Sequence, residues 1–140
     1  MNMIAKKFPT SALIDGQWIA SNRTFSVTDP ATGAEVATVP NLGADDATRA
    51  IAAAARALPA WSAKTAKERA AILKRWFDLV TAETENLAQL MTTEQGKPLA
   101  ESRAEVAYGA SFIEWFAEEG KRAYGRTIPT TAASKRYVTI

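Results

Sequence analysis

Residues 108–125 read Tyr-Gly-Ala-Ser-Phe-Ile-Glu-Trp-Phe-Ala-Glu-Glu-Gly-Lys-Arg-Ala-Tyr-Gly, and this stretch is the most informative part of the sequence. It is predicted to belong to a helix that has Pro98 in its first turn and runs to about Gly125. At about 100° per residue, the helix has an aliphatic face and an aromatic face on opposite sides. The aliphatic face contains Val106, Ala110, Ile113 and Ala117, and the aromatic face contains Tyr108, Phe112, Trp115 and Phe116. A surface helix needs only one apolar face, so the aromatic face must either pack inside this domain or meet a partner surface outside this chain. Because little chain remains after the helix, the second is predicted.

Two further helices are predicted before this one. The first follows Gly43 and ends at Pro59, since proline interrupts the helical hydrogen-bond ladder. The second begins at a capping box formed by Thr65 and Glu68 and ends at Gly96, which suits a left-handed C-terminal cap. Its predicted apolar stripe contains Ile72, Leu73, Trp76, Val80, Leu87, Leu90 and Met91. The second helix is therefore predicted to be long.

Strand signals precede the helices. Residues 13–19 place apolar side chains on both sides of Asp15-Gly16, a pair that tolerates the positive φ of a tight hairpin turn. Residues 25–28 and 36–39 are β-prone and flank the turn residues of Asp29–Gly33, which predicts a second strand pair.

The last stretch, Arg136–Ile140, is β-prone and is predicted to be a terminal strand with an open edge. The predicted fold is therefore α/β, with β-hairpins followed by three helices and a terminal strand. We expect this fold to be incomplete in the chain, because a domain seldom finishes on an uncapped apolar strand.

Composition excludes several classes of function. With 47% hydrophobic residues, the 140-residue chain can form one substantial core, and 17 basic against 15 acidic residues give no basic patch for nucleic acid. The absence of cysteine and histidine removes thiolate nucleophiles, imidazole bases and the usual zinc ligands. No secretory signal is expected in the segment Met1–Phe8, and no run is long enough to span a membrane, so a cytoplasmic location is predicted.

Three motifs together resemble one enzyme family. They are Asp29-Pro30-Ala31-Thr32-Gly33, Glu94-Gln95-Gly96-Lys97-Pro98-Leu99, and Phe112–Arg122 followed by Tyr124-Gly125. Their order and spacing are similar to those of the aldehyde dehydrogenase superfamily, and most similar to the amino-terminal part of its succinate-semialdehyde branch. The resemblance implies that residues 1–125 are the front part of the NAD(P)-binding domain. It also implies that residues 126–140 begin a truncated oligomerisation flap.

The resemblance implies a chemistry that this chain cannot perform alone. Family members attack the aldehyde with a cysteine thiolate, pass hydride from the thiohemiacetal to NAD or NADP, and release the acid by hydrolysis of the thioester. A glutamate is the general base for the water, and positioned donors stabilise the oxyanion. In the family these catalytic and cofactor-binding residues all lie beyond this segment, so none is assigned here. The implied partners are a small semialdehyde substrate and further copies of the complete enzyme in a homo-oligomer.

The resemblance also implies binding roles for two pairs of residues. Tyr108 and Phe112 match a helix that borders the substrate tunnel, although aromatic residues at helical spacing are more often core. Thr28 and Glu94 match a structural cation site, but Glu94 replaces the shorter Asp of some relatives. Lys97 is predicted to be a solvated residue between two helices and not a catalytic lysine. Gly96 before it suits the end of one helix, and Pro98 after it suits the start of the next.

The acidic residues of the 108–125 stretch read as a solvated face, in which Glu118 is expected to pair with Arg122 at i, i+4 spacing. Gly120 and Gly125 follow a helix, whereas phosphate-binding loops follow a strand, so no cofactor loop is assigned to them.

Two alternative functions fit the sequence. The first is another aldehyde dehydrogenase branch, for glutarate semialdehyde or a neutral aldehyde. The second is a non-enzymatic helical interaction module that docks through its aromatic face.

Overall fold

The computed structural model describes residues 8–128, 130–135 and 137–139. Residues 1–7, which hold most of the segment predicted to lack a secretory signal, lie outside the described residues, as do Arg136 and Ile140 of the predicted terminal strand. The strands are β1 (Ala12–Ile14), β2 (Gln17–Ile19), β3 (Thr24–Thr28), β4 (Glu35–Pro40), β5 (Arg126–Ile128) and β6 (Tyr137–Thr139). The helices are α1 (Ala44–Ser62), α2 (Ala66–Ala82), α3 (Thr84–Gln95), α4 (Leu99–Glu119) and the short 3-10 helix η1 (Gly120–Arg122).

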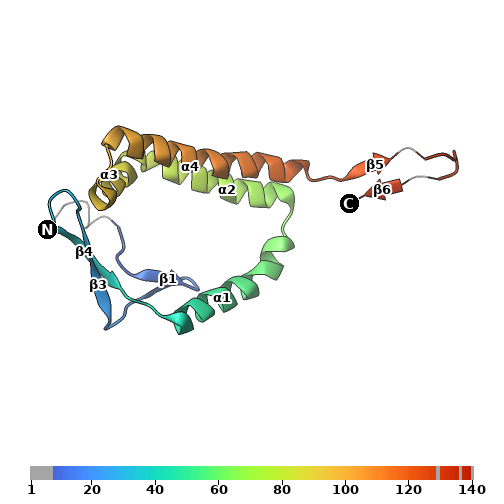
Figure 1. The fold of residues 1–140 in the computed structure, drawn as a ribbon. Helices are drawn as coiled ribbons and strands as arrows, with labels where there is room; N and C mark the ends of the chain where they lie inside the picture. The colour runs from blue at the N-terminus through green and yellow to red at the C-terminus, as the bar shows by residue number, and fades with distance from the viewer. Residues whose placement is uncertain (1–7, 129, 136, 140) are drawn as a thin grey trace.

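The elements form an open frame (Figure 1). Helices α2, α3 and α4 pack together along one side, and α1 with the β1–β2 and β3–β4 hairpins lies along the other. The β5–β6 hairpin projects away from the end of α4. Among the described residues, no helix has the length and apolar character needed to cross a bilayer.

Both predicted amino-terminal strand pairs are confirmed. Strands β1 and β2 pair antiparallel, with Leu13 opposite Trp18, and the turn residues Asp15 and Gly16 have φ of 53° and 74°. The sequence Asp-Gly permits this turn because both positions tolerate positive φ. Strands β3 and β4 also pair antiparallel, and an irregularity in their register lies between Val27 and Thr28.

Helix α1 does not end at Pro59, contrary to the prediction. It continues to Ser62, whose hydroxyl donates to the Leu58 carbonyl oxygen at 2.9 Å, and the Ala63 N–H donates to the Pro59 carbonyl oxygen at 3.0 Å. A proline removes only its own N–H from the ladder, so the last turn tolerates it when the following groups still bond.

The predicted long second helix is two helices. Glu83 separates α2 from α3 with φ −98° and ψ 9°, which is outside the helical region. No glycine or proline marks this break, and the apolar spacing continues across it. Burial varies within the predicted apolar stripe: Ile72 and Trp76 are exposed, whereas Leu73 and Val80 are half-buried.

The turn from α3 to α4 follows the predicted glycine and proline signals. Gly96 caps α3 with φ 74°, as predicted, and an added Cβ there would lie 2.9 Å from the Pro30 Cγ atom. Pro98 is the N-cap residue, one position before α4 and not inside its first turn as predicted. The helix ends at Glu119, earlier than predicted, and η1 follows before Gly125 turns the chain with φ 75°.

The core lies where α4 packs against α2 and α3, and small residues form it. The fully or nearly buried side chains of these three helices are Ala70, Ala88, Ser102, Val106, Ala110 and Ala117. The Ser102 hydroxyl is satisfied by the Thr92 hydroxyl at 2.8 Å, so its burial leaves no polar atom without a partner. Small side chains allow close helix packing, which fixes α3 beside α4.

The predicted terminal strand is paired along one edge. Tyr137 of β6 lies opposite Ile128 of β5, and Thr139 lies opposite Arg126 in an antiparallel hairpin. Strand β5 was not predicted, because Pro129 and the polar residues that follow it are typical of a loop. One edge of β6 remains uncovered among the described residues.

Candidate functional site

The α3–α4 groove is the apolar hollow bordered by α2, α3 and α4, with a volume of about 560 Å³. It is lined by Val80, Leu87, Leu90, Met91, Glu94, Gln95, Glu105, Val106, Tyr108, Gly109, Ala110, Phe112 and Ile113. An apolar hollow with a few polar groups at its rim is the usual form of a site for a small organic ligand.

Tyr108 and Phe112 meet in this groove. They are one turn apart on α4, and their rings are edge to face, with centroids 4.8 Å apart and planes at 81°. This geometry matches the charge distribution of two aromatic rings and holds both in place. Both rings remain exposed, with Tyr108 at 65% and Phe112 at 46%. Their role beside a substrate tunnel stays a prediction.

The second predicted pair lies on different elements. Thr28 ends β3, Glu94 lies in the last turn of α3, and both are exposed. The hairpin approaches α3 at a small hollow of about 70 Å³, which Val36, Val39 and Glu94 help to line. Oxygen ligands of this kind suit a hard cation, but the described residues contain no group of three His, Cys, Asp or Glu side chains around a common point. The cation site therefore stays a prediction.

Glu35 is a carboxylate beside Thr28 that sequence reasoning missed. It is the ladder partner of Thr28, and its oxygens accept hydrogen bonds from Ser26 Oγ at 2.7 Å and Thr38 Oγ1 at 2.9 Å. These hydroxyls, Ser26 before Thr38, lower the pKa of Glu35. Alternating Ser, Thr and Glu residues on facing strands are the signal that points to it.

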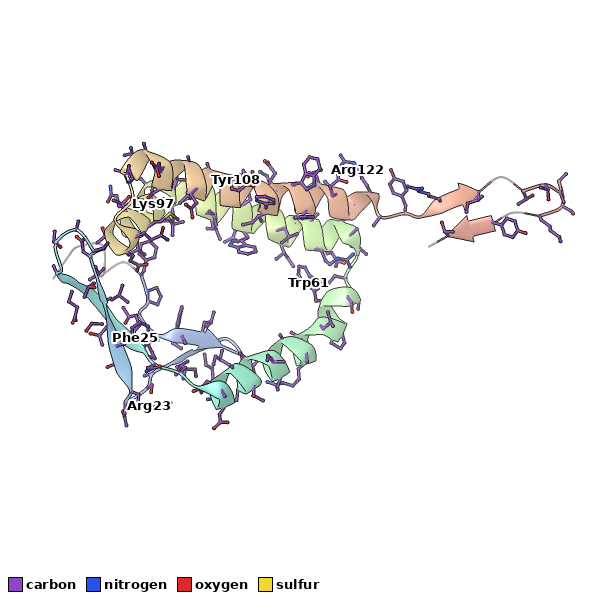
Figure 2. All side chains as sticks on the ribbon, viewed as in Figure 1. Arg23, Phe25, Trp61, Lys97, Tyr108 and Arg122 are labelled. Carbon is purple, nitrogen blue, oxygen red and sulfur yellow. The ribbon has the colours of Figure 1, made fainter. Side chains whose placement is uncertain are left out.

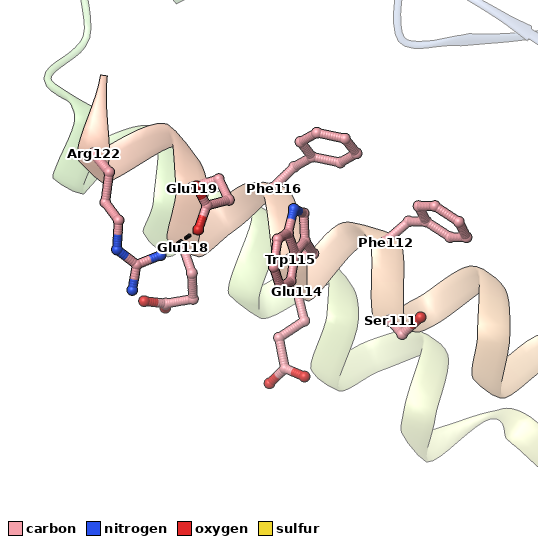
Figure 3. A pocket seen from close by; sticks show the side chains of 8 residues that line it. All are labelled: Ser111, Phe112, Glu114, Trp115, Phe116, Glu118, Glu119 and Arg122. Atoms are coloured by element: carbon pink, nitrogen blue, oxygen red, sulfur yellow. Dashed lines mark hydrogen bonds and ion pairs between the residues drawn. The ribbon is translucent and has the colours of Figure 1, made fainter. Parts of the chain in front are cut away.

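The outer face of α4 forms a second hollow of about 640 Å³, but its lining residues all come from α4 and the turn after it (Figure 3). Its carboxylates are paired: Glu114 with Lys74 at 3.5 Å, Glu118 with Lys121 at 2.7 Å, and Glu119 with Arg122. The predicted Glu118–Arg122 pair is thus wrong, because i, i+3 partners meet here instead. The Lys121 hydrogen bond lowers the pKa of Glu118, which makes it a poor general acid at neutral pH.

Lys97 is not the solvated residue that the sequence predicts. Its side chain is 22% exposed and pairs with Glu105, two turns into α4. Figure 2 shows Lys97 at the α3 end of the helical side of the frame. The pair joins the start of α4 to the turn after α3 and lies at the rim of the groove that contains Tyr108. Lys97 therefore has a structural partner that explains it without a catalytic role.

One turn among the described residues can be compared with the sites that bind dinucleotides in other folds. Such cofactors bind where a strand leads into a helix whose first turn offers free N–H groups to phosphate. Within the described residues, the turn of this kind is at residues 41–43, between β4 and α1. Asp45 and Asp46 occupy the first turn of α1, and Asp46 already faces the Gly43 N–H at 3.5 Å. Two carboxylates there would repel phosphate, so this turn does not suit the phosphates of a dinucleotide.

Comparisons with known proteins agree on one family. The model of the aldehyde dehydrogenase family matches residues 18–140. The NADP(+) succinate-semialdehyde dehydrogenase GabD of Escherichia coli is 56% identical over 95% of this chain, and the glutarate-semialdehyde dehydrogenase of Pseudomonas putida is 55% identical over 97%. A crystal structure of an E. coli NADP-dependent enzyme superposes with a TM-score of 0.86 at 56% identity, covering 94% of this chain and 28% of that one.

The chain belongs to the aldehyde dehydrogenase family. Its hairpins and helices have the α/β arrangement of the amino-terminal part of these enzymes, as predicted. It spans about 28% of the length of the E. coli relative and 29% of the P. putida relative. The groove, the paired aromatic rings and the β5–β6 hairpin are therefore features of one portion of a family fold.

Proposed function

We propose that the chain is the amino-terminal portion of an oxidoreductase that oxidises succinate semialdehyde to succinate with NAD or NADP. The 56% identity to a succinate-semialdehyde dehydrogenase, over 95% of the chain, carries this proposal. The nucleophilic cysteine would come from outside this segment, which has no cysteine. The chain's own contribution is the scaffold and one wall of the site.

Within the proposal, Tyr108 and Phe112 border the passage through which the aldehyde enters. Their edge-to-face contact and the apolar α3–α4 groove beside them give a wall that suits the methylene groups of a small semialdehyde. Phe112→Ala in the complete enzyme is expected to raise KM for the semialdehyde more than it lowers kcat, because it removes uniform binding. A fall in kcat at constant KM would argue against a role in substrate entry.

The experiment that tests the proposed function is a dehydrogenase assay of the complete protein that contains this sequence. With succinate semialdehyde and each nicotinamide cofactor in turn, reduced cofactor should form, whereas the isolated 140-residue chain should give none because it lacks a thiolate. Activity in the isolated chain, or none in the complete protein, would refute the proposal.

Glutarate semialdehyde is the second candidate substrate, because the P. putida relative named for it is 55% identical over 97% of the chain. The two substrates differ by one methylene group, which is worth roughly 10- to 200-fold in kcat/KM in a fitted pocket. The ratio of kcat/KM for the two semialdehydes in the complete protein decides between them.

The proposal extends to cation binding and assembly. Glu94 and the backbone near Thr28 would hold a structural cation, so Glu94→Gln should remove any rise in melting temperature on adding Na⁺ or K⁺ to the complete enzyme. Residues 1–125 would belong to the NAD(P)-binding domain and residues 126–140 to an oligomerisation flap of a cytoplasmic homo-oligomer. The exposed β6 strand, with Tyr137 at 58% and Val138 at 66%, supports the second assignment.

A further inference from the structure

The turn between β3 and β4 places the ring of Pro30 against the turn between α3 and α4. A Cβ atom added to Gly96 would lie 2.9 Å from Pro30 Cγ and 3.8 Å from Pro30 Cβ, so the ring fills the space that a side chain at position 96 would need. The left-handed φ of Gly96 already favours a glycine at this cap. It does not require a proline ring beside it, so the contact is a second constraint on the same position.

Hydrogen bonds within the β3–β4 turn hold the ring in one orientation. The Asp29 carboxylate accepts from the Ala31 N–H at 2.8 Å, and the Asp29 carbonyl oxygen accepts from the Gly33 N–H at 2.7 Å. The Asp29 N–H donates to the Ala34 carbonyl oxygen at 2.9 Å. Because proline also has a fixed φ, the ring cannot swing away from Gly96 as a flexible side chain would.

The residues on both sides of Gly96 belong to the α3–α4 groove or border it. Residues 94–95, immediately before it, line the groove. Lys97, immediately after it, pairs with Glu105, which lines the same groove one turn before Tyr108. A shift of the turn at Gly96 therefore moves groove residues on α3 directly and reaches those on α4 through the ion pair.

Helix α3 separates the β3–β4 hairpin from the groove. Leu90 and Glu94 line the groove, and both also line the small hollow of about 70 Å³ to which Val36 and Val39 of β4 contribute. Figure 1 shows the hairpin next to the α3 end of the helical layer. The hairpin thus supports the back of the groove wall, and Pro30 is its contact with the turn at the end of that wall.

We infer that Pro30 is a positioning residue for the α3–α4 groove: its ring fixes the turn at Gly96 and thereby sets the separation between the last turn of α3 and Tyr108. Pro30 does not line the groove, so it acts on the substrate through this turn. The inference rests on the proposed function, in which the groove and the Tyr108–Phe112 pair form a wall of the passage for the semialdehyde.

Pro30→Ala in the complete protein that contains this sequence tests the inference. The KM for succinate semialdehyde should rise about three- to tenfold while kcat stays within about twofold, because the wall is less well placed and the reacting groups are unchanged. A purely structural role predicts a different result, since unfolded enzyme lowers apparent kcat at constant KM. Pro30 is exposed, so the loss of its ring removes little core packing.

Two further variants of the same turn serve as controls. Pro30→Val keeps γ carbons near Gly96 and should raise KM less than Pro30→Ala does, which also provides a test if the alanine variant folds poorly. Thr32→Ala removes the hydroxyl that accepts from the Ala34 N–H at 3.3 Å but leaves the ring in place. Its KM should stay within about twofold of that of the unmodified protein.

A double variant separates positioning from stability. Gly96→Ala alone forces its methyl group against the ring and should raise KM. In Pro30→Ala/Gly96→Ala the same methyl lies 3.8 Å from the remaining Cβ, an ordinary contact that fills the space left by the ring. KM should return to within about twofold of the unmodified value, whereas the melting temperature should stay low because the positive φ still strains an alanine.

The outcomes distinguish this inference from the proposed function. Normal turnover with an unchanged KM in Pro30→Ala would overturn the inference alone. So would KM increases that multiply in the double variant, since the two positions would then act independently. A complete protein that oxidises neither semialdehyde would refute the proposed function, and the positioning role would be refuted with it.

Discussion

At the scale of single residues, Gly96 makes the sharpest prediction. Its φ of 74° disfavours any side chain, and an added Cβ would lie 2.9 Å from Pro30 Cγ, which is too close. Gly96→Ala should therefore lower the free energy of unfolding by about 1 to 3 kcal/mol. Denaturant melts of the chain measure this loss.

Gly120→Ala is the matched control. Gly120 has the right-handed helical conformation, with φ −58° and ψ −21°, and an added Cβ there would have no neighbour within 4 Å. Alanine should stabilise this position slightly or leave it unchanged. If both variants lose equal stability, the contact between Gly96 and Pro30 does not determine the cost.

Features that the local backbone conformation determines could be predicted from sequence. The partners of charged side chains in ion pairs could not. The positive φ of Asp15, Gly16 and Gly96 follows from their own conformational preferences, so the turn and the cap are confirmed. The partners of Lys97 and Glu118 depend on which of several reachable charges lies nearest once helices pack. Long side chains reach i+3, i+4 and other elements at similar cost, so spacing alone does not decide among them.

At the scale of elements, one ion pair joins α3 to α4 and makes a pH prediction. Arg103 donates to both oxygens of Glu85, with Nε at 2.8 Å and a terminal nitrogen at 2.9 Å, and Gln89 adds a hydrogen bond at 3.0 Å. Arg103 first, and then Gln89, lower the pKa of Glu85 from 4.5 to about 2. A carboxylate with a lowered folded-state pKa stabilises the fold above its unfolded pKa, and this contribution is lost as pH falls through the folded one.

The chain should therefore lose melting temperature as pH falls from 4.5 to about 2, and Glu85→Gln should flatten this part of the profile. Glu101→Gln, which removes an exposed carboxylate of α4 that makes no ion pair among the described residues, is the control. If the two variants have the same pH profile, the Glu85–Arg103 pair does not link the helices. Both side chains are about half exposed, so salt should weaken the effect.

The helical segments were predictable from sequence, but the residues at which helices end were less so. Apolar spacing and the Thr65–Glu68 capping box correctly indicate where α2 begins, and both residues bond as the motif requires. The break at Glu83 has no glycine or proline, and the Thr84 hydroxyl bond to the Thr81 carbonyl oxygen that accompanies it is a weak local signal. Helices α2 and α3 both pack against α4, and periodicity within one segment carries little information about a break between them.

At the scale of the whole molecule, the exposed aromatic face of α4 gives a stability prediction that depends on context. Trp115 and Phe116 are 62% and 61% exposed in this chain. Trp115→Ala should cost about 3 to 5 kcal/mol in the complete enzyme if the ring is buried there, and at most about 0.5 kcal/mol in the isolated chain. Denaturant melts of the variant in both contexts measure the difference, and equal losses would show that the ring is already packed within these residues.

The candidate site was predicted only in part. Tyr108 and Phe112 could be placed on one helix face from their spacing, but the groove beside them also needs Leu87 and Met91 of α3. That arrangement depends on the turn at Gly96, which folds α3 back against α4. Sequence periodicity describes one helix at a time, so it could not predict a hollow formed by three.

The last prediction concerns the β5–β6 hairpin, which projects from the frame and leaves one edge of β6 uncovered among the described residues (Figure 1). Tyr137 and Val138 are 58% and 66% exposed, so the open edge carries apolar side chains as well as free backbone groups. Such an edge recruits strands from other molecules, and a net charge of +2 gives weak repulsion between chains. The isolated chain should therefore self-associate.

Val138→Lys should reduce this self-association, because a charge in the middle of an edge strand opposes pairing with a second strand. Thr131→Lys adds the same charge to the exposed loop between β5 and β6 and should have little effect. Light scattering over a range of concentrations compares the three proteins. The edge explanation fails if the unmodified chain stays monomeric at high concentration, or if both lysine variants improve solubility equally, since net charge alone would then account for the change.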